Sequence, residues 1–322
     1  MNGDIADIRM RLPIAEAWRA LNLPGEPRRS CSSPFRDDKN PSFSVYHEAT
    51  GDRWKDHGEG SGGDVLDLIE KAKGLTTAEA LTWARGVLGI DPKADRRPDG
   101  KRRWTPDLKF GTPDQLQRLS TLRGFSLPGL EAASRRGFLR FAEMAKREAW
   151  CVTDRRRQVI ELRRLDGLKW DAYGSLPARK AHCVGTGKNW PVGIEEAVDF
   201  EKCALVEGAP DVLALFHFMH AEERTDIATL GVLGAASHRL APEALQKLRG
   251  KDVCLYPHAD DAGAAAAKAW ARSLRDAGAK VMAFDLSGII CADGRPGKDL
   301  ADVCRINYDC FERERKFWKL LP

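Results

Sequence analysis

Apolar and polar positions follow their most regular pattern in the last third of the chain. Four apolar runs, CALVEG, DIATLGV, DVCLYPHADD and KVMAFDL, are typical of strands, and the segments between them show helical spacing that begins near Asp211, Pro242 and Gly263. Strand, helix and strand in this alternation predict a parallel sheet with right-handed crossover helices. The expected fold class is therefore α/β, with a parallel sheet flanked by helices.

The first 200 residues give shorter elements. Helices are predicted over residues 14–21, 64–73, 113–122 and 127–136, and β-favouring residues on both sides of Thr50-Gly51-Asp52 predict a hairpin over residues 41–56. Strands are expected in AWCVTD, QVIELRRLDG, KWDAYGS and WPVGI, and a stretch rich in Pro, Gly and charge, residues 92–105, predicts a linker. We expect four parts: a small N-terminal domain (1–92), a basic linker (93–108), a basic α+β subdomain (109–200) and the parallel-sheet domain (201–322).

Composition adds limits on location and cofactors. The chain has 322 residues, of which 43% are hydrophobic and 31% charged, as in folded soluble proteins. It contains no run of about 18 apolar residues and no signal-peptide pattern, so we expect a cytoplasmic protein with no membrane partner. Its eight cysteines are scattered without a CxxC pair, which argues against a disulfide framework and against a cysteine-rich zinc site.

Positive charge is concentrated rather than large. The net charge is only +5, but basic residues gather in DRRPDGKRRW, at residues 95–104, and again between residues 135 and 164. Such runs fit either a nucleic-acid contact or an ordinary solvated face, and both interpretations stay open.

Acidic residues follow three of the predicted strands or their neighbouring loops. Glu207 ends CALVEG, Asp260 ends DVCLYPHAD and Asp299 lies in GKDLADV. Ligands of an open parallel sheet bind beyond the carboxyl ends of its strands, so these acids are expected to meet in one crevice. Carboxylates that meet repel one another unless a hard cation such as Mg²⁺ or Mn²⁺ neutralises them, which is the chemistry of phosphoryl transfer. Helix capping by Asp211 or Asp261, or a turn at Asp299, is the alternative for each acid taken alone.

The segments EGAPD, HADDAG and KDLAD, at residues 207–211, 258–263 and 298–302, together resemble the TOPRIM domain of primases, topoisomerases and related nucleases, over residues 201–304. The resemblance implies that the glutamate is a metal ligand or general acid-base and that Glu207, Asp260 and Asp299 are the catalytic residues. His258 stands where the family has an acid, and imidazole favours softer ions than Mg²⁺. The metal-binding candidates are Glu207, Asp211, His258, Asp260, Asp261 and Asp299.

The N-terminal part resembles the zinc ribbon of bacterial and phage primases. The frame is present in Pro34-Phe35, in Asn40-Pro41-Ser42-Phe43 and in Gly62-Gly63-Asp64, but the four ligand positions hold Ser33, Arg36, Asp56 and Glu59. None of these is a thiolate or imidazole of the kind that holds structural zinc, so we expect no zinc. An ion pair between the arginine and the two carboxylates is expected to join the two loops instead.

The basic subdomain resembles, more weakly, the part of primases that lines the groove for template and nucleotide. Arg163, Arg164, Lys180 and Lys188 are the candidates for contacts with a triphosphate or a nucleic-acid backbone, since guanidinium and ammonium groups neutralise phosphate charge. Ordinary surface charge is the alternative for these four residues.

Taken together, the resemblances imply a primase-like nucleotidyltransferase that makes short RNA primers on a single-stranded DNA template from nucleoside triphosphates with Mg²⁺ or Mn²⁺. The chain ends soon after the third acidic segment, which suits a phage, plasmid or other mobile element with a separately encoded replicative helicase as a partner. Two alternatives remain: a TOPRIM nuclease that uses the same acids, and a non-catalytic DNA-binding or replication accessory protein.

Overall fold

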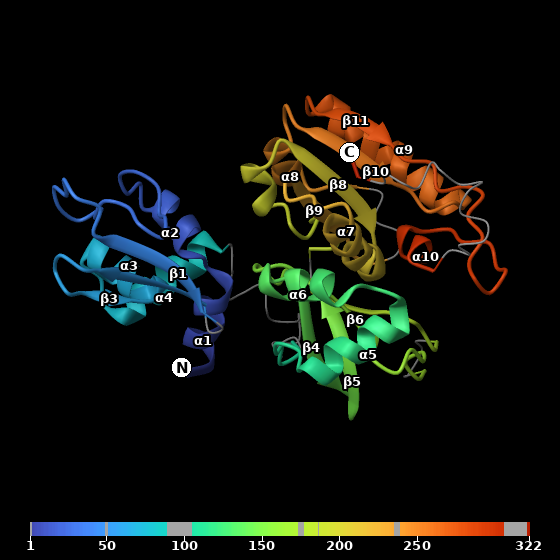
Figure 1. Cartoon of the computed structure of the whole chain (residues 1–322), viewed down its shortest axis with the longest axis horizontal. Helices are drawn as coiled ribbons and strands as arrows, with labels where there is room; N and C mark the ends of the chain where they lie inside the picture. The colour runs from blue at the N-terminus through green and yellow to red at the C-terminus, as the bar shows by residue number, and fades with distance from the viewer. Residues whose placement is uncertain are drawn as a thin grey trace, which may run out of the picture. The chain divides into compact units, whose positions relative to one another are not determined.

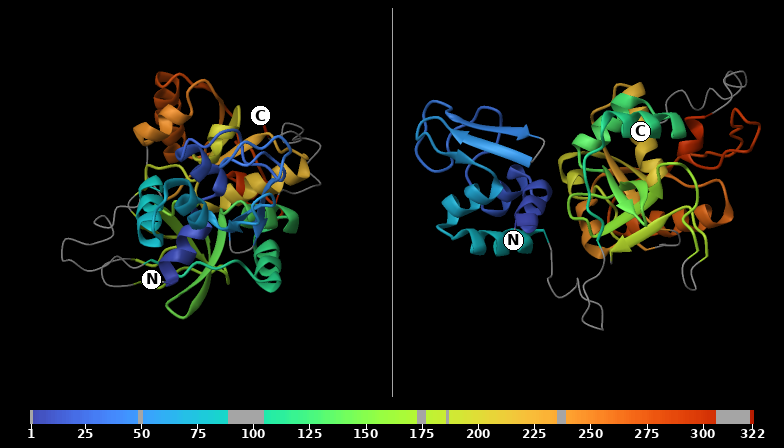
Figure 2. Two further views of the ribbon diagram at one scale, coloured as in Figure 1. Left: turned by 90° about the vertical axis from the view of Figure 1, so that its left-hand side faces the viewer. Right: turned by 90° about the horizontal axis from the view of Figure 1, so that it is seen from below.

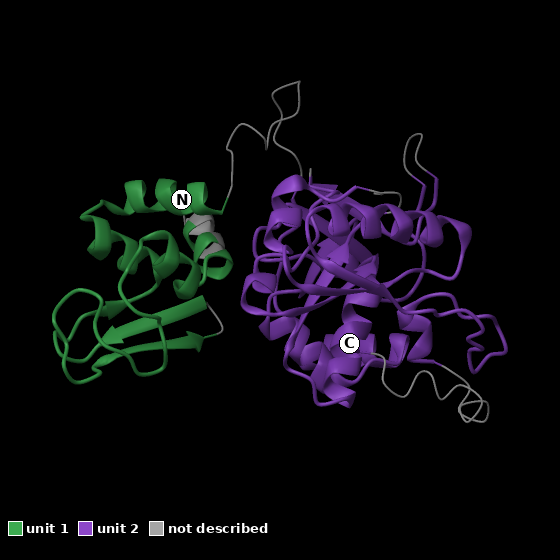
Figure 3. Cartoon of the chain, turned by 90° about the horizontal axis from the view of Figure 1, so that it is seen from above, with its two compact units in different colours: residues 1–103 green, residues 104–322 purple. Residues whose placement is uncertain are grey.

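The computed structural model describes residues 2–48, 51–88, 105–172, 177–185, 187–234, 239–305 and 321–322, and it divides into two compact units, residues 1–103 and 104–322 (Figure 3). Most of the predicted linker, residues 93–104, lies outside the described residues. Within the described ranges, no helix has both the length and the apolar character that crossing a bilayer requires.

Unit 1 combines helices with a small antiparallel sheet in the order β1-β2-β3. Its elements are α1 (Asn2–Arg11), α2 (Ile14–Ala20), β1 (Phe43–Glu48), β2 (Gly51–Asp56), β3 (Gly62–Gly63), α3 (Val65–Lys73) and α4 (Thr77–Val87). The hairpin and the helices predicted near residues 14–21 and 64–73 are confirmed, whereas α1 and α4 were not predicted.

Aromatic side chains form the centre of unit 1. Phe43 stacks on Trp54 with ring centroids 5.2 Å apart, and Trp18 packs edge-on against Phe43. The Trp54 indole donates a hydrogen bond to the carbonyl of Asp64, the N-cap of α3, whose side chain accepts from Leu66 and Asp67. The loops on either side of the hairpin are thereby fixed to one packed core.

The first half of unit 2 is a four-stranded antiparallel sheet in the order β4-β5-β6-β7 with two helices against it. Its elements are α5 (Pro113–Arg123), α6 (Leu127–Arg135), β4 (Leu139–Met144), β5 (Arg147–Val152), β6 (Val159–Arg164) and β7 (His182–Gly185). Strand β4 was not predicted, because Arg140 occupies a position of the strand that is only 6% exposed and so interrupts the apolar pattern.

The second half of unit 2 is a parallel sheet in the order β11-β10-β8-β9, which confirms the expected α/β fold class. Its elements are η1 (Glu196–Asp199), β8 (Lys202–Glu207), α7 (Ala209–Ala221), β9 (Ile227–Val232), α8 (Pro242–Lys247), β10 (Asp252–Tyr256), α9 (Asp261–Asp276), β11 (Lys280–Ala283) and α10 (Leu300–Val303). Figure 1 labels these elements except η1.

Helices cover both faces of the parallel sheet, as the two further views also show (Figure 2). Along β8, Ala204 and Val206 pack in the cluster that contains α7, whereas Cys203 and Leu205 pack in the cluster that contains α8 and α9. A strand buried on both faces explains why these segments read as continuous apolar runs. The α7 side of the core also includes residues of β4 and β5, so the two sheets of unit 2 share one core.

Two predicted strands are wrong. Trp170 and Val192 each form only an isolated bridge, to Arg179 and Gly231, and no strand is present in the described residues of KWDAYGS or in WPVGI. In WPVGI, Pro191 has no N–H to donate to a ladder and Gly193 has a φ of +88°, which an extended strand does not allow. Residues 173–176 of the first segment lie outside the described part of the chain.

Candidate functional site

The acidic residues gather at the carboxyl ends of β8 and β10. Glu207 is the last residue of β8, and Gly208 follows with a φ of +82°, a conformation that glycine adopts without strain. This turn starts α7 at once and so places Asp211 on its first turn, beside the strand end. Because β8 and β10 are parallel neighbours, with Val206 opposite Tyr256, the loop after β10 carries His258 to the same edge.

Side chains from three segments make the cluster. His258 Nε2 lies 2.8 Å from Asp211 Oδ2, and His258 Nδ1 lies 3.9 Å from Glu207 Oε2. The other oxygen of Asp211 accepts a hydrogen bond of 2.8 Å from the backbone N–H of Ala301 in α10, whose N-cap is Asp299. One ligand atom each of Asp211, His258 and Asp299 lies within 4.8 Å of the other two.

Burial and charge act in opposite directions on this cluster. Burial alone lowers the pKa of His258, but the hydrogen bond with Asp211 and the charges of Asp211, Glu207 and Asp299 raise it to about 9. Burial, with the charge of Asp299, raises the pKa of Asp211 to about 7, and burial also raises the pKa of Asp299. The hydrogen bond between His258 and Asp211 therefore opposes the effect of burial on both groups: it raises the pKa of His258 and lowers that of Asp211.

The two acids of the second motif point elsewhere. Asp260 is the N-cap of α9, where it accepts a hydrogen bond from Gly263 N–H, and it also forms an ion pair of 3.3 Å with Lys298. The backbone hydrogen bond, followed by the lysine, lowers the pKa of Asp260. Asp261 is exposed on the first turn of α9. Neither residue belongs to the group of Asp211, His258 and Asp299, and Glu207 also lies outside this group, although its side chain is 3.9 Å from His258.

Strand register separates the two candidate arginines of β6. Arg163 lies opposite Trp150, on the face that packs in the core shared with α7, and donates to Glu161 at 2.8 Å. Glu161 Oε2 lies 3.9 Å from the position that a Cβ atom would have at Gly208. The ion pair of Glu161 and Arg163 is therefore beside the turn that follows Glu207. Arg164 lies opposite Ala149 on the other face and pairs with Asp166.

The two candidate lysines also differ. Lys188 is exposed and lies close enough to Cys183, as Arg163 does, for its charge to act on that thiol. Lys180 is exposed, and among the described residues no contact connects it to the acidic cluster.

Arg123, at the end of α5, is a site residue that the sequence did not predict. Its guanidinium lies over the Trp150 ring at 5.5 Å, and its Nε is buried without a hydrogen-bond partner. Burial and the nearby charges of Arg163 and Arg305 lower the pKa of Arg123 to about 10, while Asp299 and Asp211 act in the opposite direction. Guanidinium groups therefore border the acidic cluster, a combination that suits a phosphate ligand.

The donor set of the cluster fits a divalent cation. Carboxylate oxygens suit Mg²⁺ and Mn²⁺, and an imidazole nitrogen favours transition-metal ions over Mg²⁺. Histidines that bind metals commonly donate their second N–H to a carboxylate. The contact between His258 Nε2 and Asp211 has this arrangement in the tautomer that carries the proton on Nε2, and Nδ1 then faces Glu207.

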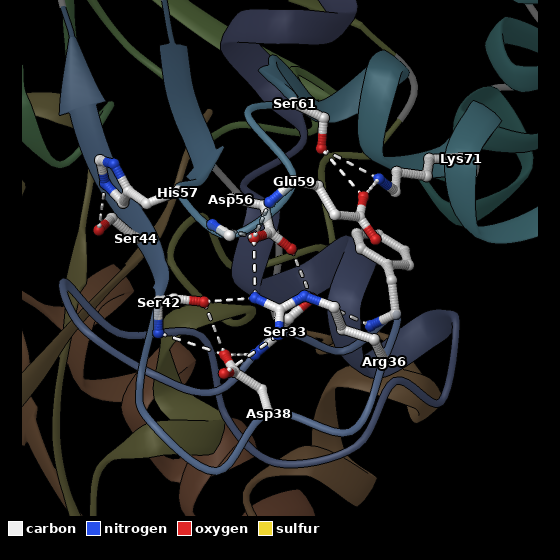
Figure 4. Close-up of polar contacts among 12 residues, drawn as sticks. Ser33, Arg36, Asp38, Ser42, Ser44, Asp56, His57, Glu59, Ser61 and Lys71 are labelled. Atoms are coloured by element: carbon white, nitrogen blue, oxygen red, sulfur yellow. Dashed lines mark hydrogen bonds and ion pairs between the residues drawn. The ribbon is translucent and has the colours of Figure 1, made fainter.

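The four positions of unit 1 that the sequence resemblance aligns with zinc ligands, Ser33, Arg36, Asp56 and Glu59, do not fit zinc (Figure 4). Arg36 Nη2 lies 3.2 Å from Asp56 Oδ1, and the Ser33 hydroxyl donates to Asp56 Oδ2 at 2.6 Å. Glu59 pairs with Lys71 and not with Arg36. A structural zinc site needs thiolate and imidazole donors. These positions instead hold a guanidinium, a hydroxyl and a carboxylate that is hydrogen-bonded to both of them.

Comparison with known proteins identifies the part of the chain that carries the acidic cluster. Residues 204–303 match the family described as Toprim-like. This segment is therefore similar to Toprim-like domains, and we refer to it below as the Toprim-like domain. The match confirms the resemblance expected over residues 201–304, and Glu207, Asp211, His258 and Asp299 are all within the Toprim-like domain.

Two solved structures are similar to the chain over most of its length. One is the Aquifex aeolicus primase, zinc binding and RNA polymerase domains, with 17% identity, a TM-score of 0.41, and coverage of 97% of this chain and 83% of that chain. The other is the primase fragment of the bacteriophage T7 primase-helicase protein, with 12% identity, a TM-score of 0.40, and coverage of 90% of this chain and 97% of that chain. No curated protein matches the chain.

Proposed function

We propose that the chain is a primase-like nucleotidyltransferase that extends RNA primers on a single-stranded DNA template. The observation that carries the proposal is the meeting of carboxylates and His258 at the strand ends of the Toprim-like domain, bordered by Arg123 and Arg163. An acidic cluster can hold a divalent cation and an adjacent arginine pair can hold phosphate, and phosphoryl transfer requires both functions in one pocket.

The roles that we assign to these residues follow from how exposed their side chains are. Glu207 is 22% exposed at its side chain and can reach a substrate, whereas Asp211 is 1% exposed and has both oxygens in hydrogen bonds. We therefore assign Glu207, His258 and Asp299 as the residues that hold the cation, and Asp211 as the residue that orients the imidazole. The bound cation would supply Lewis-acid stabilisation of the charge that develops on the phosphate.

The proposed reaction joins the 3′-hydroxyl of the growing primer to the α-phosphate of a nucleoside triphosphate. A new oxygen-to-phosphorus bond forms, the bond between the α- and β-phosphates breaks, and pyrophosphate leaves. Glu207 is the accessible carboxylate that can accept the hydroxyl proton. Arg123 and Arg163 would neutralise the triphosphate and hold it in line for attack.

Nucleotide incorporation tests this function directly. The purified chain is incubated with single-stranded DNA, labelled nucleoside triphosphates and either Mg²⁺ or Mn²⁺, with Glu207→Gln as the matched variant. We expect metal-dependent primers from the wild type and a loss of at least about a hundredfold in the variant. Metal-dependent nicking without incorporation would establish a nuclease, and DNA binding with neither product would establish an accessory protein.

A further inference from the structure

Two loops of unit 1 meet around one guanidinium group. The first loop runs from Ser33 to Ser42 and the second from Asp56 to Glu59, and Arg36 of the first lies between Asp56 and Asp38. The Arg36 guanidinium lies 3.2 Å from a carboxylate oxygen of each aspartate. We propose that Arg36 takes the place of the structural zinc ion of the ribbon, so that unit 1 folds without a metal.

The two carboxylates are buried and their oxygens are engaged. Asp56 is 0% exposed, and it accepts hydrogen bonds from the Ser33 hydroxyl and from the backbone N–H groups of Gly58 and Glu59 as well as from Arg36. Asp38 has a 5% exposed side chain that accepts from the N–H groups of Ser33 and Ser42 and from the Ser42 hydroxyl. A cation is required between two buried carboxylates, and Arg36 supplies it.

Backbone geometry shows that the second loop is shaped to the guanidinium. A Cβ atom at Gly58 would lie 2.1 Å from Arg36 Nη2, so with any other residue here the guanidinium would have to shift from its present position. Gly58 N–H donates to the same Asp56 oxygen that Arg36 contacts. The loop therefore closes around an organic cation with several donors in a plane, a geometry that a single metal ion does not share.

The donors that zinc would need are absent from this position. Cys31 donates to the carbonyl of Arg28. His57 contacts Ser44 (Figure 4), so both residues are engaged outside the network. Cys31 is the only cysteine in residues 1–103. It follows that the fold of unit 1 depends neither on zinc supply nor on the oxidation of ligand thiols, unlike a ribbon held by cysteines.

Metal content and local unfolding test the proposal on the full chain. We expect less than about 0.1 zinc per chain by elemental analysis after growth with added zinc, and amide exchange in residues 33–59 that EDTA does not change. Arg36→Ala should speed that exchange at least about tenfold and Arg36→Lys should restore part of the protection, whereas Glu59→Gln should change it less than about twofold. Stoichiometric zinc, or equal exchange in Arg36→Ala and the wild type, would overturn the proposal.

A gain of zinc binding tests whether the loops keep the ribbon geometry. The variant Ser33→Cys, Arg36→His, Asp56→Cys and Glu59→Cys restores a ligand set of three thiolates and one imidazole. We expect it to bind one Co²⁺ with the absorption of a tetrahedral thiolate site, and to regain the exchange protection of residues 33–59 when zinc is added. A variant that binds no Co²⁺, or that binds it without regaining protection, would show that Arg36 does not stand in a zinc position.

Discussion

Asp56→Asn is the sharpest perturbation of the network in unit 1. The substitution keeps the shape of the side chain, but it removes the charge that faces Arg36 and presents an amide N–H₂ to a pocket filled with donors. Asp56 accepts from Ser33 Oγ, Arg36 Nη2, Gly58 N and Glu59 N, at distances between 2.6 and 3.2 Å. Breaking a buried ion pair on one side typically costs 3–5 kcal/mol, and the partial exposure of Arg36 reduces this, so we expect a loss of about 3 kcal/mol.

The assay must report on unit 1 alone, because the nine tryptophans of the chain are spread over both units. Amide exchange of peptides from residues 41–73, followed against urea, gives the free energy of unfolding of this unit. A loss of 3 kcal/mol in a unit of this size also lowers its melting temperature by more than about 10 °C. Glu59→Gln is the control, since it removes only a pair near the surface and should cost less than about 1 kcal/mol. A loss below about 1 kcal/mol in Asp56→Asn would refute the reasoning.

Three further predictions concern pH, phosphate and metal. Burial raises the pKa of Asp56, but its hydrogen bonds outweigh burial and lower the pKa, and hydrogen bonds also lower the pKa of Asp38. Their contribution to stability is therefore present above about pH 4 and is lost as the pH falls below it. Amide exchange of unit 1 from pH 7 to pH 3 measures this, and a flat profile would contradict it. Arg163→Gln should weaken the binding of single-stranded DNA or nucleotide about tenfold, whereas Arg164→Gln, on the other face of β6, should change it less than about twofold. Fluorescence anisotropy measures both affinities. Equal effects of the two substitutions would contradict the assignment of Arg163 to the face of the site. His258→Asp should shift the ratio of Mg²⁺ affinity to Mn²⁺ affinity at least about tenfold in favour of Mg²⁺. Isothermal titration calorimetry with each ion measures this ratio. An unchanged ratio would show that His258 is not a metal ligand.

The general arrangement of unit 2 follows from the sequence because its determinants are local. Apolar runs that end in Glu207 and near His258 mark the strand ends, and parallel neighbours then bring both residues to one edge. The pattern could not tell that α9 begins at Asp261, and this start makes Asp260 an N-cap instead of a member of the cluster.

Other site features depend on tertiary contacts that no local pattern encodes. The fold places the Arg123 guanidinium over the Trp150 ring and close enough to Asp299 and Asp211 for their charges to act on it. Arg163 and Arg164 are adjacent in sequence, and only the register of β6 decides which one faces the site. In unit 1, complementary charge predicted an ion pair of Arg36 with Asp56 and Glu59. The pair with Asp56 is present, but the second partner is Asp38, and Glu59 pairs with Lys71 instead.

Binding of Mn²⁺ to the Toprim-like domain tests the central claim most directly. Titration of the full chain, followed by the loss of the free Mn²⁺ signal in electron paramagnetic resonance, counts the ions and measures their affinity. We predict a site that Glu207→Gln and Asp299→Asn each weaken at least about tenfold, while Asp299→Asn keeps the cap of α10 because asparagine is also a good N-cap. Mn²⁺ binding of equal affinity in the wild type and both variants, or no binding at all, would contradict the claim that this cluster holds a cation.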